Sequence, residues 1–142
     1  YKMGNKKGAF EIFDKSVELD PDNHIALNNY AYYLSLTGMY LDKAERMSGR
    51  VIEMFPENST YLDTYAWVLF KKGEYALAKF YIESAIKFDQ ENNPTLIEHY
   101  GDILFKLDKI DEAVNNWEKA LELGGDSDQL KRKINEKKYF EE

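Results

Sequence analysis

Residues 59–93 decide the fold of this chain, and they read STYLDTYAWVLFKKGEYALAKFYIESAIKFDQENN. The apolar and small residues of this stretch form two series with helical spacing. The first series consists of Leu62, Tyr65, Ala66 and Leu69, and the second of Ala78, Ile82, Ala85 and Ile86. Side chains three, four and seven positions apart lie on one face of an α-helix. Gly73 stands between the two series and is typical of the end of a helix. The stretch therefore predicts two amphipathic helices joined by a tight turn.

The same pattern recurs along the whole chain at a nearly constant interval. Its columns, separated by 34 or 35 residues, are Tyr30, Tyr65 and Tyr100; Leu34, Leu69 and Leu104; Gly38, Gly73 and Asp108; and Ala44, Ala78 and Ala113. Pro21 and Pro56 lie in turn sequences that close two of the units. Several columns in one register indicate an internal repeat, and no segment alternates with the two-residue period of a strand.

Small residues occupy the positions where the two predicted helices of a unit approach each other. Ala31, Ala66 and Gly101 in the first helices are expected to face Ala44, Ala78 and Ala113 in the second. A larger side chain at such a position would force the helices apart, at a cost of about 1–3 kcal/mol.

Composition excludes several classes of function. The 142 residues carry 19 basic and 26 acidic side chains, a net charge of −7, which argues against a nucleic-acid duplex as the main partner. There is no cysteine, so thiolate catalysis and thiolate metal sites are excluded. No apolar run approaches the roughly 20 residues of a transmembrane helix.

The sequence contains no recognisable catalytic motif. It has no glycine-rich phosphate loop, no nucleophile elbow and no His-Glu-x-x-His pattern. His24 and His99 lie in different units and are expected to be polar groups at a helix end or beside a groove. We therefore expect no catalysis, no cofactor and no metal.

The pattern resembles the tetratricopeptide repeat (TPR) family, whose motif combines a large apolar residue, an apolar–small pair, a Tyr or Leu, a Gly and later an Ala. The resemblance implies an all-α fold, a right-handed α-solenoid of antiparallel helix pairs forming a single domain over residues 1–142. Within it we expect a partial repeat at 1–23, full repeats at 24–58, 59–93 and 94–127, and a C-terminal capping helix at 128–142. Five basic residues of this last segment, Lys131, Arg132, Lys133, Lys137 and Lys138, are expected to form a solvated face.

In the resembled family, one row of the first helices lines a concave peptide-binding groove. The residues of this row on which we base the prediction are Tyr32, Asp63, Trp67, Phe70, Glu98, Asp102 and Phe105. Aromatic side chains beside carboxylates favour an apolar or basic partner. Family members that bind acidic chaperone tails use a Lys, Arg and Asn clamp, which this row lacks. The alternative for Trp67 and Phe70 is that they pack under the next helix.

We therefore predict a non-catalytic protein–protein interaction scaffold that binds a peptide or protein segment. The alternative is an accessory, docking or self-association region of a longer envelope protein or enzyme. A homodimer would then form through the N-terminal half-repeat, where Phe10, Phe13 and Val17 lack a neighbouring helix. The resemblance to bacterial TPR proteins favours the cell envelope over the cytoplasm, with any membrane anchor upstream of this chain.

Overall fold

The computed structural model describes residues 12, 14–15, 18–20, 22–125 and 127–139. Its helices are α2 (His24–Thr37), α3 (Leu41–Met54), α4 (Ser59–Lys71), α5 (Tyr75–Phe88), α6 (Pro94–Lys106), α7 (Ile110–Glu122) and α8 (Asp128–Glu136). None of the described residues forms a strand, so the predicted all-α fold class is confirmed. No helix among them is long and apolar enough to cross a membrane.

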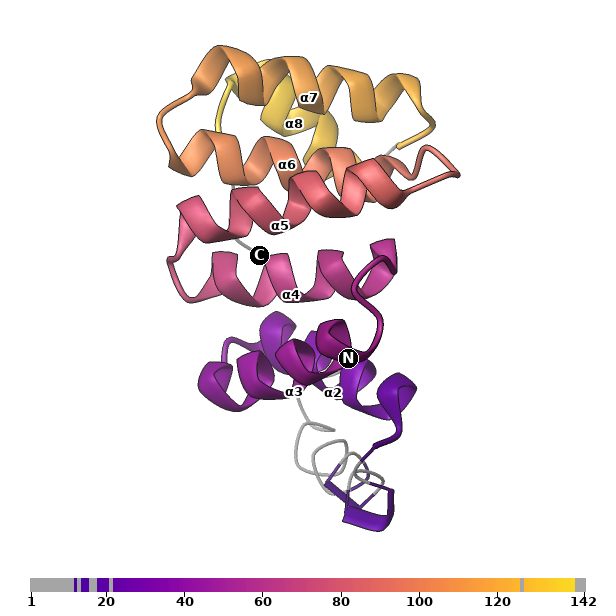
Figure 1. Cartoon of the computed structure of the whole chain (residues 1–142). Helices are drawn as coiled ribbons and strands as arrows, with labels where there is room; N and C mark the ends of the chain where they lie inside the picture. The colour runs from indigo at the N-terminus through magenta and orange to yellow at the C-terminus, as the bar shows by residue number, and fades with distance from the viewer. Residues whose placement is uncertain (1–11, 13, 16–17, 21, 126, 140–142) are drawn as a thin grey trace.

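The helices form a solenoid of consecutive pairs (Figure 1). α2 packs against α3, α4 against α5, and α6 against α7, and each pair also contacts the next through α3–α4 and α5–α6. The first helices of the pairs contact each other in the order α2, α4, α6. After the third pair, α8 packs against α7.

Asparagine and serine side chains begin several of these helices. Asn23, Asn58 and Asn93 accept a hydrogen bond from a first-turn backbone N–H of α2, α4 and α6, and Ser127 does the same for α8. Asn58 accepts from the Tyr61 N–H at 3.1 Å, and Ser127 accepts from the Leu130 N–H at 3.0 Å.

The turn inside each pair needs a residue in the left-handed region. Gly38 and Gly73 have φ of 73° and 85°, and Asp108 has φ of 64° at the corresponding place of the third pair. Aspartate tolerates this conformation better than most residues with a Cβ atom, which explains how it replaces glycine there.

The predicted close approach is confirmed for Gly101 and Ala113, because a Cβ atom added to Gly101 would lie 3.1 Å from the Ala113 carbonyl oxygen. Ala31, Ala66, Ala44, Ala78 and Ala113 are fully buried. Gly101 illustrates the constraint, because a Cβ atom added to it would lie 2.5 Å from the indole of Trp117. The second helix of that pair therefore carries its largest side chain where the first helix has none.

The buried apolar side chains form two clusters rather than one uninterrupted interior. One extends from Leu62 to Tyr139, and the other from Leu27 to Val68. α4 contributes to both, and Ile52 in α3 packs against both. The clusters are separate because neighbouring residues of α4 face different pairs: Tyr61 and Val68 face the first, while Leu62 and Leu69 belong to the second.

The N-terminal segment is only partly described. Asp14 accepts hydrogen bonds from the Tyr30 hydroxyl at 2.6 Å and from Lys43 Nζ at 2.8 Å, which ties it to α2 and α3. Phe10, Phe13 and Val17 lie outside the described residues, so pairing through a half-repeat stays a prediction. The division into one partial and three full repeats likewise stays a prediction.

Candidate functional site

Among the described residues, one pocket is lined only by the first helices of the pairs and by residues 127–139, the C-terminal segment. We call it the groove pocket; it has a volume of about 310 Å³. Its lining residues are Tyr32 and Leu36 from α2, Trp67 and Lys71 from α4, Glu98, His99 and Asp102 from α6, and Ser127, Gln129, Lys133 and Tyr139 from the α8 segment. The side chains of α3, α5 and α7 do not contribute to it.

Trp67 and His99 form the central wall of the groove pocket. The two rings stack with their centroids 4.0 Å apart, and Trp67 also stacks on Phe70 at 4.6 Å. His99 Nδ1 lies 2.8 Å from Asp63 Oδ1. Burial opposes protonation of the imidazole, but the charge of Asp63 and the hydrogen bond to it outweigh burial and raise the pKa of His99.

A buried charged cluster closes the C-terminal end of the pocket. Lys133 Nζ donates to Glu98 Oε2 at 2.7 Å and to Asp102 Oδ1 at 2.9 Å, while Trp117 Nε1 donates to the same Asp102 oxygen at 3.0 Å. The side chains of Lys133 and Asp102 are only 3% and 2% exposed. Burial raises the pKa of Asp102 to about 6, although Lys133 and His99 oppose this.

Tyr139 packs against the Phe70 ring beside this cluster. Its ring packs edge-on against Phe70 with centroids 5.4 Å apart, and Nζ of Lys106 and of Lys133 lie 5.5 and 5.3 Å from its centre. Lys137, with φ of 51°, ends α8 just before this contact. The last described residues thus return toward α4.

The structure brings together four of the seven predicted groove residues as lining of one pocket: Tyr32, Trp67, Glu98 and Asp102. Asp63 reaches the pocket through its hydrogen bond to His99. Phe70 is 3% exposed and lies beneath Tyr139 and Trp67. Phe105 does not line the pocket; its ring lies 6.0 Å from that of Trp117. Trp67 is 7% exposed and packs on His99 of α6, as the alternative stated, and it also lines the pocket, as the groove prediction stated.

Sequence reasoning missed Lys133 and Tyr139 as part of this site. The prediction that all five basic tail residues form a solvated face is wrong for Lys133, which is buried against α6. The signal for it was present: Lys133 follows the apolar residue Leu130 by one helical turn and precedes Ile134, so all three share a face.

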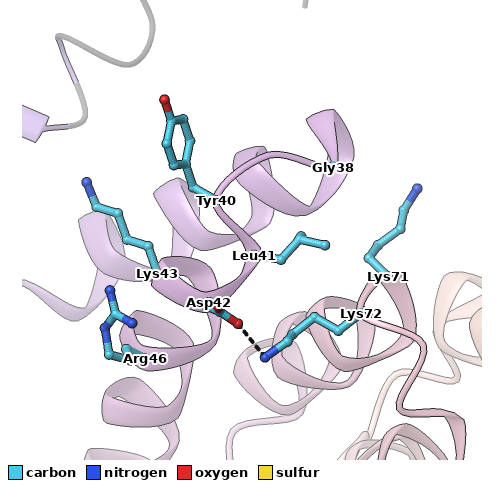
Figure 2. A pocket seen from close by; sticks show the side chains of 8 residues that line it. All are labelled: Gly38, Tyr40, Leu41, Asp42, Lys43, Arg46, Lys71 and Lys72. Atoms are coloured by element: carbon cyan, nitrogen blue, oxygen red, sulfur yellow. Dashed lines mark ion pairs between the residues drawn. The ribbon is translucent and has the colours of Figure 1, made fainter.

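A second pocket has the larger volume, about 780 Å³, and lies at the turn between α2 and α3 (Figure 2). Half of its described lining residues are basic, namely Lys43, Arg46, Lys71 and Lys72. The ion pair of Lys72 with Asp42, at 2.7 Å, joins α3 to the end of α4. Lys72 also contacts Glu45 and Lys43 contacts Asp14, so two of these cations already serve to connect helices. In Figure 2 Lys71 and Lys43 point away from each other, so their charges do not converge on one point.

The described residues show no group of three His, Asp or Glu side chains that could hold a metal ion. The groove pocket presents stacked rings, carboxylates and one buried lysine.

Comparison with known proteins places the chain in a family. A family model described as "Anaphase-promoting complex, cyclosome, subunit 3" matches residues 37–120, more than half of the chain, and a tetratricopeptide repeat model matches residues 12–45. The chain belongs to this family of TPR proteins, a class of helical repeat proteins that typically act as protein-interaction modules. No curated protein sequence matches it.

Solved structures of TPR proteins share the fold. The first TPR of Spaghetti (RPAP3), bound to the HSP90 peptide SRMEEVD, has a TM-score of 0.72 at 19% identity, covering 83% of this chain and 92% of that one. The Sgt2 TPR domain from Aspergillus fumigatus has a TM-score of 0.72 at 20% identity, with 82% and 77% covered. YrrB, described as a TPR protein with an unusual peptide-binding site, has a TM-score of 0.70 at 24% identity, with 88% and 63% covered.

Proposed function

We propose that this chain is a non-catalytic scaffold that binds a peptide segment of another protein in the groove pocket. The observation that carries the proposal is that every described residue lining this pocket belongs to α2, α4, α6 or the C-terminal segment. Stacked first helices give a continuous surface, which suits an extended or helical segment. The peptide in the RPAP3 structure supports the same kind of ligand on the same fold.

The side chains of the pocket favour an apolar and basic segment. Tyr32 and Leu36 are 37% and 43% exposed in the pocket, and Trp67 adds the 7% of its surface that its stacking on His99 and Phe70 leaves accessible. Glu98 and Asp102 add two carboxylates, and Asp63 stands directly behind His99. Aromatic anchors supply contact area, while opposite charge fixes the register of the bound segment.

An acidic ligand such as the SRMEEVD peptide of the RPAP3 structure does not suit this surface. Its carboxylates would have to compete with Glu98 and Asp102 for Lys133 and with Asp63 for His99, because these residues already bind the two cations. We therefore propose that the partner differs from acidic chaperone tails.

The test is selection of peptides from a random display library on the full chain, followed by affinity measurement by fluorescence anisotropy. Peptides enriched in Lys or Arg together with aromatic residues are expected. Enrichment in Asp and Glu would contradict the proposed partner chemistry.

The groove itself is tested by a matched pair of variants. Leu36 lines the pocket and is 43% exposed, whereas Leu77 in α5 is 44% exposed and does not line it. Leu36→Lys is expected to weaken binding of the selected peptides at least tenfold, and Leu77→Lys to leave it unchanged. Equal effects of the two would show that the peptides bind elsewhere. Trp67→Ala and Phe70→Ala are unsuitable because both rings belong to the buried core.

A further inference from the structure

The groove pocket already holds part of this chain. Lys133 places its ammonium group between the carboxylates of Glu98 and Asp102, at 2.7 and 2.9 Å. Six positions later, Tyr139 lies with its ring edge against Phe70. One lysine and one aromatic ring thus occupy the features that we propose for recognition of a partner.

The segment is also attached through the apolar side of α8. α8 has nine residues, which is shorter than the roughly 12–15 residues at which an isolated helix becomes stable. Its apolar contribution to the core comes from Leu130 and from the partly buried Ile134, whereas Arg132 and Glu136 pair with each other on its exposed side. Leu130 therefore anchors the start of α8, and Lys133, Ile134 and Tyr139 attach the segment beyond it.

The side of the pocket formed by α2 is not occupied by the C-terminal segment. Tyr32 and Leu36 form a wall from α2, and the space between this wall and the α8 segment is the 310 Å³ of the groove pocket. An incoming segment can contact α2 and Trp67 while the C-terminal segment is in place, but the carboxylates of Glu98 and Asp102 are engaged by Lys133.

We infer that residues 133–139 are an intramolecular ligand of the groove, and that the partner is a segment with a lysine and an aromatic residue about six positions apart that displaces them. This inference rests on the proposed function. Lys133 and Tyr139 indicate which side chains the site binds. Because they belong to the same chain, they compete with a partner at a high effective concentration, and the partner must bind tightly enough to displace them.

The experiment uses the full chain and a fluorescein-labelled synthetic peptide with the sequence of residues 127–139. The wild-type chain is expected to bind it weakly, because its own segment occupies the site. Tyr139→Ala, which removes the contact with Phe70 and keeps the ion pairs, is expected to bind it at least tenfold more tightly. Lys131→Ala, on the exposed side of α8, serves as the control and should match the wild type.

The peptide has its own control. A version with alanine at the positions of Lys133 and Tyr139 is expected to lose at least tenfold in affinity for the Tyr139→Ala chain. Equal binding of both peptides, or equal affinity of the wild-type and Tyr139→Ala chains for the parent peptide, would overturn the inference.

Hydrogen exchange separates this inference from the proposed function. When a library-selected peptide binds the wild-type chain, amide exchange over residues 130–136 should accelerate at least tenfold, because the segment leaves the groove. If the selected peptides bind in a Leu36-dependent way while these amides stay as protected as in the free chain, the groove function stands and the displacement is wrong. If no peptide depends on Leu36, both proposals are wrong.

Discussion

Replacement of Lys133 by methionine should destabilise the fold in a pH-dependent way. The substitution keeps the approximate volume of the side chain and removes its charge. It leaves Asp102, whose side chain is 2% exposed, with Trp117 as the hydrogen-bond donor that remains in this cluster. A buried carboxylate without a cation is costly, so Asp102 is expected to stay protonated in the variant.

The size of the effect follows from the pKa of Asp102, which is raised to about 6 in the native chain. At pH 7.5 the variant must keep this carboxyl neutral, and the interval from about 6 to 7.5 corresponds to about 2 kcal/mol, at 1.36 kcal/mol per pKa unit. Loss of the charged hydrogen bond to Glu98 adds about 1 kcal/mol. We expect a loss of about 3 kcal/mol at pH 7.5 and of about 1 kcal/mol at pH 5, where Asp102 is largely protonated in both proteins.

The assay is urea denaturation followed by circular dichroism at the two pH values. Lys131→Met, at an exposed position of the same helix, is the control and should change the free energy of unfolding by less than about 0.5 kcal/mol. The double variant Lys133→Met, Asp102→Asn should recover stability at pH 7.5. This account of the cluster would be refuted if the Lys133→Met variant lost the same free energy of unfolding at both pH values. It would also be refuted if adding Asp102→Asn did not restore stability at pH 7.5.

Three further changes test other parts of the structure. Gly101→Ala should lower the free energy of unfolding by about 1–3 kcal/mol, because its Cβ would lie 2.5 Å from Trp117; an unchanged urea midpoint would contradict this. Asp108→Gly should raise the thermal midpoint, corresponding to about 0.5–1 kcal/mol, since glycine adopts φ of 64° without strain. In the wild type, raised pKa values of Asp102 and His99 mean that the folded state binds protons more tightly than the unfolded state. The contribution of Asp102 to the free energy of unfolding is fully present below about pH 4 and is lost as the pH rises through about 6. The contribution of His99 is fully present below about pH 6.5 and is lost above it. The free energy of unfolding should therefore decrease from pH 5 to pH 8 in urea titrations.

Much of the fold could be predicted from sequence because repetition multiplies weak signals. A single Tyr-Ala pair says little, but Tyr30, Tyr65 and Tyr100 at equal steps fix the register of three first helices. The same register predicts small residues at Ala66 and Gly101 between the helices; Ala66 is fully buried, and Gly101 lies close against the second helix of its pair.

The site was harder to predict because it depends on where α8 lies. Nothing in the repeat pattern says which face of a terminal helix meets the preceding pair, so the charged sequence around Lys133 was interpreted as solvated. The burial of Asp102 depends on Trp117 and Lys133, one on α7 and one on α8, and such convergence is a property of packing. Phe105 shows the opposite error, because it belongs to the predicted row of groove residues but does not line the pocket.

The division of the interior at α4 has a consequence for the width of the binding site. Tyr32 and Leu36 stand on α2, whose pair rests on the smaller apolar cluster, while Trp67, Glu98 and His99 belong to elements supported by the larger one. Opening of the α2/α3 pair would expose the smaller cluster and break the contact of Ile52 with the larger one, and it should still cost less than global unfolding. The side of the pocket formed by Tyr32 and Leu36 is therefore expected to move more readily than the side formed by Trp67 and Glu98.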